Sequence, residues 1–157
     1  SLGEFGHFVS CLNFNCRQAI SAKIGIRSSD DTNALLPQRL IYATKDLRNA
    51  IAHNDVVFDT RFRTGNIDKQ VSNAISNATG VPVLTFETVT DYVVLIVYQL
   101  SLLRISKNET KRLISSFVDC TEKLRKAIPV SVYNQIILTD NNVKSAALRK
   151  FVKAKTK

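Results

Sequence analysis

The chain is poor in the residues that build disulfide frameworks, metal centres and phosphate loops. It has no Trp and no Met, only two His and three Cys, and no glycine-rich phosphate-binding motif. Cys11, Cys16 and Cys120 cannot all pair, and this odd count without framework spacing indicates a reducing cytosol. His7 and Cys11 stand four residues apart, but two ligands do not make a zinc site. We therefore expect the cysteines to be core residues, with no bound metal and no cofactor.

Long hydrophobic runs are also missing. The most apolar stretch, residues 92–103, is interrupted by Gln99 and Ser101 and is too short to cross a bilayer. No signal peptide is visible, and the absence of an initiator Met indicates that Ser1 is not the natural start. At 157 residues the chain fits one domain. We expect a cytoplasmic protein without a membrane partner.

Charge is distributed unevenly along the chain. Residues 1–100 hold nine Lys or Arg and nine Asp or Glu, whereas residues 101–157 hold thirteen and four and so supply the whole net charge of +9. The last 17 residues carry six cations and no acid. This asymmetry favours an anionic partner such as nucleic acid. The alternative is a solvated tail that improves solubility.

Apolar residues recur at helical spacing through most of the chain. No segment shows sustained strand alternation, although the β-branched run at residues 92–98 is ambiguous. Ser1 and Ser106 each precede a Glu by three residues, which is the spacing of a helix capping box. The pattern predicts an all-α, antiparallel helical bundle of about five to seven helices, over residues 1–23, 37–54, 67–79, 87–105, 107–128, 131–138 and from 140 or 141 onward.

One segment of the second expected helix, residues 47–54, concentrates chemistry. Arg48 is a fixed cation with forked donors, and His53 is the side chain that titrates nearest neutral pH. Asp46, Asn49 and His53 fall on one polar face, whereas Arg48 lies roughly 140° around the axis from His53. The two converge only through the reach of Arg48 or in a pocket that a second protomer helps to build. The alternative is structural: Arg48 pairs with a carboxylate and His53 ends a helix.

Two groups of cations are candidates for nucleic-acid contact. Arg61 and Arg63 alternate around Phe62, and cations interleaved with an aromatic residue serve phosphate binding and base stacking. The alternative, which is the more common role of such a segment, is a loop with one anchoring Phe. The second group lies on the last expected helix and consists of Lys144, Arg149, Lys150 and Lys153. In this helix we expect the apolar residues, Val143 among them, to point inward and the basic residues to point outward.

Several segments together resemble a known family. The sequence from Arg48 to His53 fits the Arg-x4-His pattern of HEPN domains, and residues 47–54 resemble the Arg-Asn-x-x-Ala-His box of bacterial Abi-like (abortive infection, AbiD/AbiF-type) proteins. Residues 1–8, 55–62 and 95–107 are similar to other segments of that family. Two features depart from it: Asn54 stands where a second His is common, and the usual N-terminal portion is absent.

The resemblance implies a HEPN-like bundle over residues 1–140, with residues 141–157 as a basic helix or tail packed on it or extending from it. It further implies a homodimer whose Arg-x4-His segments meet at the interface of a metal-independent endoribonuclease. Arg48 would bind the scissile phosphate, His53 would act as general acid or base, and Asn49 would orient the substrate or the imidazole. Asp46, which lies outside the family pattern, would hold His53 protonated. Asn54 would be a second supporting residue of the site.

Three functions therefore compete. The first is RNA cleavage in abortive infection and phage defence, or as a toxin with a possible antitoxin partner. The second is a non-catalytic HEPN module that binds nucleic acid or protein through its basic C-terminal segment. The third is a helical DNA-binding or partner-binding domain unrelated to HEPN.

Overall fold

The structure, a computed structural model, describes residues 1–26, 31–52 and 67–154, and within them the regular secondary structure consists of helices alone. This confirms the all-α prediction. Eight helices lie in the described residues: α1 (Leu2–Cys11), α2 (Phe14–Ile24), α3 (Leu36–Ala52), α4 (Lys69–Thr79), α5 (Val89–Leu102), α6 (Lys107–Ala127), α7 (Val130–Ile136) and α8 (Asn141–Ala154).

The first expected helix is in fact two, so the prediction of one helix to residue 23 was wrong. Leu12 is extended, and the Asn13 side chain accepts a hydrogen bond from the Cys16 N–H at 2.9 Å, which caps α2. The Arg17 guanidinium stabilises the turn between α1 and α2 by donating hydrogen bonds to the carbonyl oxygens of Ser10 and Leu12. The apolar spacing continues past Asn13, but the hydrogen bond of its side chain to the nearby backbone separates the two helices.

The other helix ends follow their local sequence. Both expected capping-box serines, Ser1 and Ser106, accept a hydrogen bond from the backbone N–H of the Glu three residues later. Gly25 and Gly80 end α2 and α4 in the left-handed conformation that glycine adopts without a steric penalty. Asp68 caps α4 through the Gln70 N–H.

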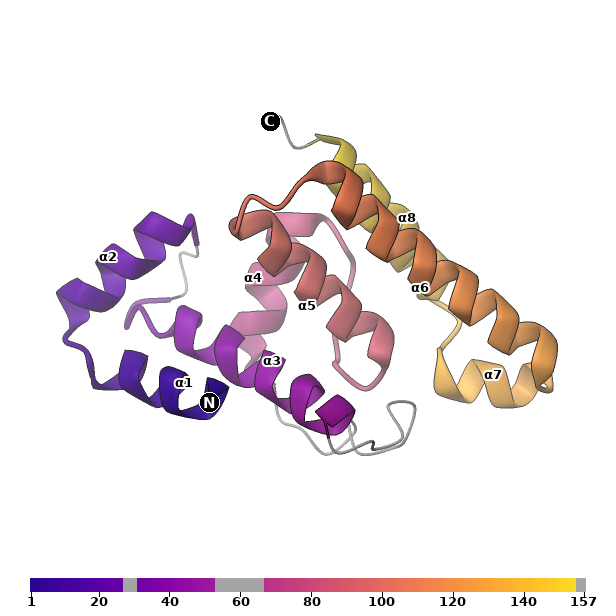
Figure 1. Cartoon of the computed structure of the whole chain (residues 1–157), viewed down its shortest axis with the longest axis horizontal. Helices are drawn as coiled ribbons and strands as arrows, with labels where there is room; N and C mark the ends of the chain where they lie inside the picture. The colour runs from indigo at the N-terminus through magenta and orange to yellow at the C-terminus, as the bar shows by residue number, and fades with distance from the viewer. Residues whose placement is uncertain (27–30, 53–66, 155–157) are drawn as a thin grey trace.

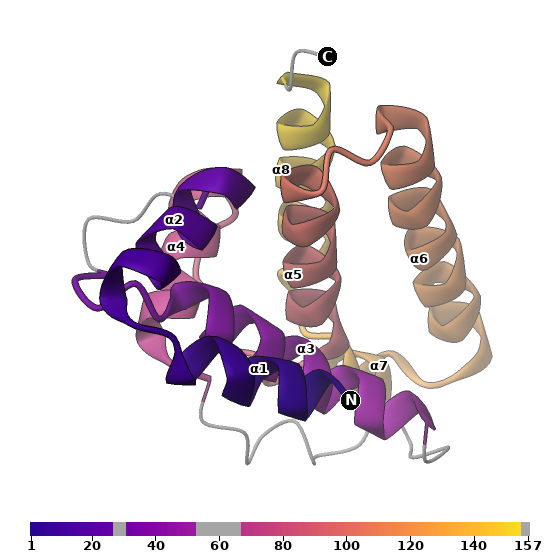
Figure 2. The same cartoon turned by 60° about the vertical axis from the view of Figure 1, so that its left-hand side comes forward.

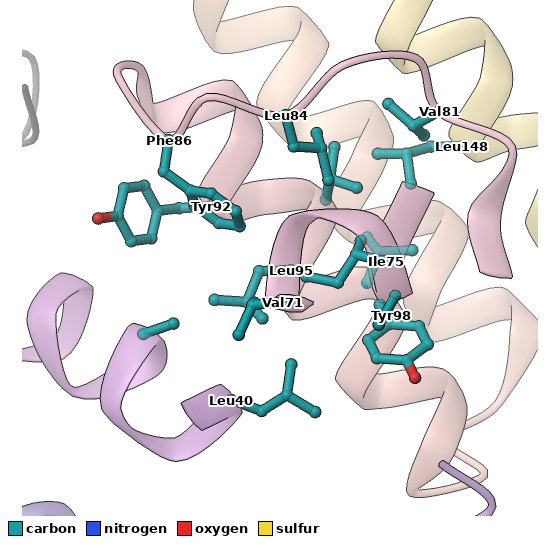
Figure 3. Close-up of a cluster of buried hydrophobic side chains, with 14 of the residues drawn as sticks. Leu40, Val71, Ile75, Val81, Leu84, Phe86, Tyr92, Leu95, Tyr98 and Leu148 are labelled. Atoms are coloured by element: carbon teal, nitrogen blue, oxygen red, sulfur yellow. The ribbon is translucent and has the colours of Figure 1, made fainter. Parts of the chain in front are cut away.

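Helix α5 occupies the middle of the molecule (Figure 1). It contacts α3, α4, α6 and α8, while α6 and α8 pack against each other. Figure 2 shows α5, α6 and α8 side by side, with α1 and α3 running across one end of them. The core lies where α3, α4, α5 and α8 meet, and Figure 3 shows Leu40, Ile75, Leu95 and Leu148 pointing into it.

In the described part of the chain, the main contact of helix α1 is with α3. The buried residues in α1 are Gly6 and Val9. A Cβ atom on Gly6 would lie 3.2 Å from Tyr42 Cζ and 3.3 Å from Ile41 Cγ2, so glycine permits this close approach. The apolar residues of α1 are therefore only partly buried: Phe5 and Phe8 are 53% and 58% exposed.

Other inward assignments need correction. Cys11, Cys16 and Cys120 are all exposed, so the interpretation of them as core residues was wrong. Val143, which was expected to point inward, is exposed, and so is Ile51 on α3. Among the described helices, none is both long enough and apolar enough to span a bilayer.

Candidate functional site

The last turns of α3 carry the described part of the predicted catalytic segment. Arg48 is exposed, and its Nη1 donates a hydrogen bond to Asn49 Oδ1 at 3.1 Å. Within the described residues its guanidinium forms no ion pair. The structure thus brings two of the three predicted catalytic side chains together and leaves the cation facing solvent. Four predicted site residues, His53, Asn54, Arg61 and Arg63, lie outside the described residues.

The helix beneath Arg48 is firmly seated. Leu36, Leu40, Ala43 and Leu47 of α3 are buried in the core. The Thr44 hydroxyl and the Gln99 side chain of α5 are hydrogen-bonded, with Nε2 2.7 Å from Oγ1, and Gln99 Nε2 also donates to the Leu40 carbonyl at 3.3 Å. A functional group on such a rigid element is held more accurately than one on a loop.

Asp46, predicted to support His53, acts on a different neighbour in the described structure. The residue is exposed, yet partial burial of its carboxyl raises the Asp46 pKa, against the opposing charge of Lys45. Its negative charge in turn acts on Tyr92 of α5. Burial first, then the charges of Asp46 and Asp91, raise the pKa of Tyr92 to about 12. The charge of Asp46, although this residue is exposed, therefore acts on a buried residue of the core. The role of Asp46 toward His53 stays a prediction.

Lys144 was wrongly predicted to contact RNA, because it is almost completely buried. Its side chain is 1% exposed, and Nζ lies 2.6 Å from Asp91 Oδ1 and 2.8 Å from Asp140 Oδ2. Burial lowers the Lys144 pKa, but the hydrogen bonds and charges of Asp140 and Asp91 outweigh it, so the pKa is raised. Lys144 stays charged and serves the fold.

Asp91, on which this ion pair rests, did not stand out in the sequence. Its carboxylate is 0% exposed and accepts hydrogen bonds from the backbone N–H groups of Thr85 and Phe86, both at 2.9 Å, in addition to the bond from Lys144. These bonds fix the turn before α5, in which Phe86 has a φ of 57°. The signal was present as an Asp in the first turn of an otherwise apolar helix, opposite the Asp140–Lys144 pair.

The other three basic residues assigned to α8 are exposed. Arg149, Lys150 and Lys153 line a groove of about 290 Å³ between α8 and Val118 of α6. Lys150 also borders a larger groove of about 570 Å³, between α8 and the segment that ends α4. Cations beside an open groove suit the binding of a phosphodiester backbone. RNA contact by these residues stays a prediction.

The two predicted regions do not form one surface. Figures 1 and 2 show the C-terminal end of α3 and the C-terminal end of α8 at opposite ends of the molecule. A strand of RNA held by both regions would therefore have to run along the molecule rather than lie in one pocket. No group of three or more His, Cys, Asp or Glu residues suitable for a metal ion occurs in residues 1–26, 31–52 and 67–154.

The chain was compared with protein-family models, with curated proteins and with solved structures, and no match was found in any of the three.

Proposed function

We propose that the chain is a metal-independent endoribonuclease of the HEPN type, which acts in abortive infection or as a toxin and has its site at a homodimer interface. The observation that carries the proposal is Arg48: a solvent-facing guanidinium, in contact with Asn49, on a helix that is fixed in the core. A forked cation in this position suits a phosphodiester, because it donates two parallel hydrogen bonds to phosphate oxygens.

The proposed reaction assigns one task to each side chain. The 2′-hydroxyl of RNA loses its proton to a base, and its oxygen attacks phosphorus. The bond from phosphorus to the 5′-oxygen then breaks, and the leaving oxygen takes a proton. His53 serves as the base or the acid, and Arg48 stabilises the charge that develops on the phosphoryl oxygens. The products are a 2′,3′-cyclic phosphate and a 5′-hydroxyl.

The test is cleavage of end-labelled RNA by the purified chain in EDTA. We expect cleavage by the native chain, with cyclic-phosphate ends, and its loss in Arg48→Ala and in His53→Ala. Arg112→Ala is the matched control, because Arg112 is an exposed arginine on α6. Equal cleavage by all four proteins would identify a contaminating nuclease. A native chain that cuts no RNA would overturn the proposal.

The second candidate function is nucleic-acid binding without cleavage. The observation that favours it is the exposed row of Arg149, Lys150 and Lys153 beside the grooves of α8. It predicts that a triple Ala variant of these residues loses RNA affinity. A control that removes the same charge elsewhere on the surface, Lys111, Lys123 and Lys126 to Ala, retains it. Equal losses in the two variants would reduce the effect to net charge alone.

A further inference from the structure

Helix α1 presents a histidine and a cysteine together on its solvent-facing side. His7 Nε2 lies 3.7 Å from Cys11 Sγ, and both residues are exposed. They are four residues apart, which places them one above the other on the helix. Imidazole nitrogen and thiolate sulfur are the two ligand types that zinc prefers in structural sites.

The separation of the two atoms matches the geometry of a zinc ion. Zinc binds sulfur at about 2.3 Å and histidine nitrogen at about 2.0–2.1 Å, which at a tetrahedral angle puts the two ligand atoms about 3.6 Å apart. The 3.7 Å between Nε2 and Sγ is already this spacing. The side chains therefore fit two corners of a tetrahedron with little rearrangement.

Two ligands leave half of the coordination sphere empty. In the described part of the chain no third His, Cys, Asp or Glu joins the pair. Glu4, on the preceding turn of α1, is engaged in the capping box with Ser1. A second copy of α1, related by a two-fold axis, supplies the missing ligands in the correct number and kind, since a two-fold contact presents the same residues from both sides.

We propose that α1 carries half of an intermolecular zinc site, in which His7 and Cys11 of two copies bind one Zn²⁺ ion tetrahedrally. Each thiol releases its proton to solvent on binding, so that two thiolates balance the charge of the ion. Phe8, which is exposed and lies about 60° around the helix axis from Cys11, would lose contact with water as the two helices meet. This site is separate from RNA cleavage, which is proposed to need no metal.

The experiment uses Co²⁺ as a spectroscopic substitute for Zn²⁺, added to the reduced, metal-free chain. We expect the visible bands of tetrahedral cobalt and a thiolate charge-transfer band, both saturating at one ion per two chains and bleached by Zn²⁺. At chain concentrations where the metal-free protein is monomeric, light scattering should show that Zn²⁺ doubles the mass and that EDTA reverses the change.

Variants of single exposed residues sharpen the test. Cys11→Ser and His7→Ala should abolish the cobalt bands and the mass increase. Cys16→Ser and Cys120→Ser, which also remove an exposed thiol, should leave both intact. The proposal fails if the complex has one ion per monomer, if Cys11→Ser still gives the thiolate band, or if no ion binds at micromolar concentrations. None of these outcomes depends on whether the chain cleaves RNA.

Discussion

The end of α3 and the start of α8 each carry a basic residue, but the two side chains differ in exposure and in their partners. Arg48 faces solvent and contacts a neighbour on its own helix, whereas Lys144 is buried against carboxylates of two segments. In the sequence both are basic residues on amphipathic helices. The difference is made by Asp91 on α5, because a lysine enters the core only where a buried carboxylate compensates the cost of removing its charge from water. A cation is therefore placed by its partner rather than by its helix alone.

The largest effect expected from this comparison is on stability. Lys144→Ala leaves the Asp91 carboxylate buried without its cation, which should lower the free energy of unfolding by about 3–5 kcal/mol. Lys150→Ala, an exposed lysine on the same helix, should change it by less than about 0.5 kcal/mol. Urea unfolding followed by circular dichroism measures both.

A double variant sharpens the same point. Asp91→Asn combined with Lys144→Met should be less destabilised than the sum of the single variants, because each substitution removes the charge that the other leaves unpaired. Strict additivity of the two unfolding free energies would show that the pair is not coupled.

Arg48 should show the reverse pattern, with an effect on chemistry and none on folding. Arg48→Ala should lower the RNA cleavage rate by about 10²–10³-fold, the cost of losing one preorganised donor to a developing oxyanion. Its unfolding free energy should stay within about 0.5 kcal/mol of the native value, because the side chain is exposed. Arg48→Lys keeps the charge but not the forked donors, and should recover binding of RNA more than its cleavage.

The alkaline pH range tests the burial of Tyr92 on α5, whose pKa also responds to the charge of Asp46 on α3. The Tyr92 pKa is raised to about 12, so the folded chain keeps this phenol proton while the unfolded chain loses it near pH 10. The resulting stability is complete below pH 10 and is lost as the pH rises toward 12, by up to about 3 kcal/mol. Tyr92→Phe should make this decline smaller, whereas Tyr42→Phe should not; the part that remains includes Tyr98, whose pKa is also raised by burial. If the unfolding free energy of the native chain depended on pH in the same way as that of Tyr92→Phe, this prediction would be refuted.

The smallest effect expected is that of Asp46. Asp46→Asn removes one of the negative charges that raise the Tyr92 pKa, so the phenol should titrate at a lower pH than in the native chain. Ultraviolet absorbance of the phenolate measures this shift. Glu87→Gln, which removes one exposed carboxylate elsewhere on the chain, serves as the control.

Helical periodicity and caps were enough to predict the fold class and most helix positions. Ser106, Gly80 and the apolar run before Leu103 mark ends that the structure places within a few residues of expectation. The break at Asn13 was missed because Leu12 and Cys16 continue the apolar spacing across it, while the capping bond from Asn13 competes with the helix only locally.

Which side of a helix faces inward was harder to predict than the helix itself. Val143 is exposed and Lys144 is buried, because Asp91, far away in sequence, lies beneath the first turns of α8. Periodicity within one helix carries no information about such a partner. For the candidate site, the polar character of the end of α3 was readable from the sequence. The proposed convergence of Arg48 with His53 would depend on tertiary and quaternary contacts, which the spacing of residues does not encode.

The hydrogen bonds between Thr44 and Gln99 have a consequence for motion. Hydrophobic side chains tolerate sliding, because one apolar contact replaces another at little cost, but a partly buried amide has few alternative partners. Displacing α3 along α5 by one turn would separate the amide from both the hydroxyl and the Leu40 carbonyl. The two helices should therefore keep a single axial register, and any rearrangement that repositions Arg48 would have to rotate or carry α3 and α5 as a unit.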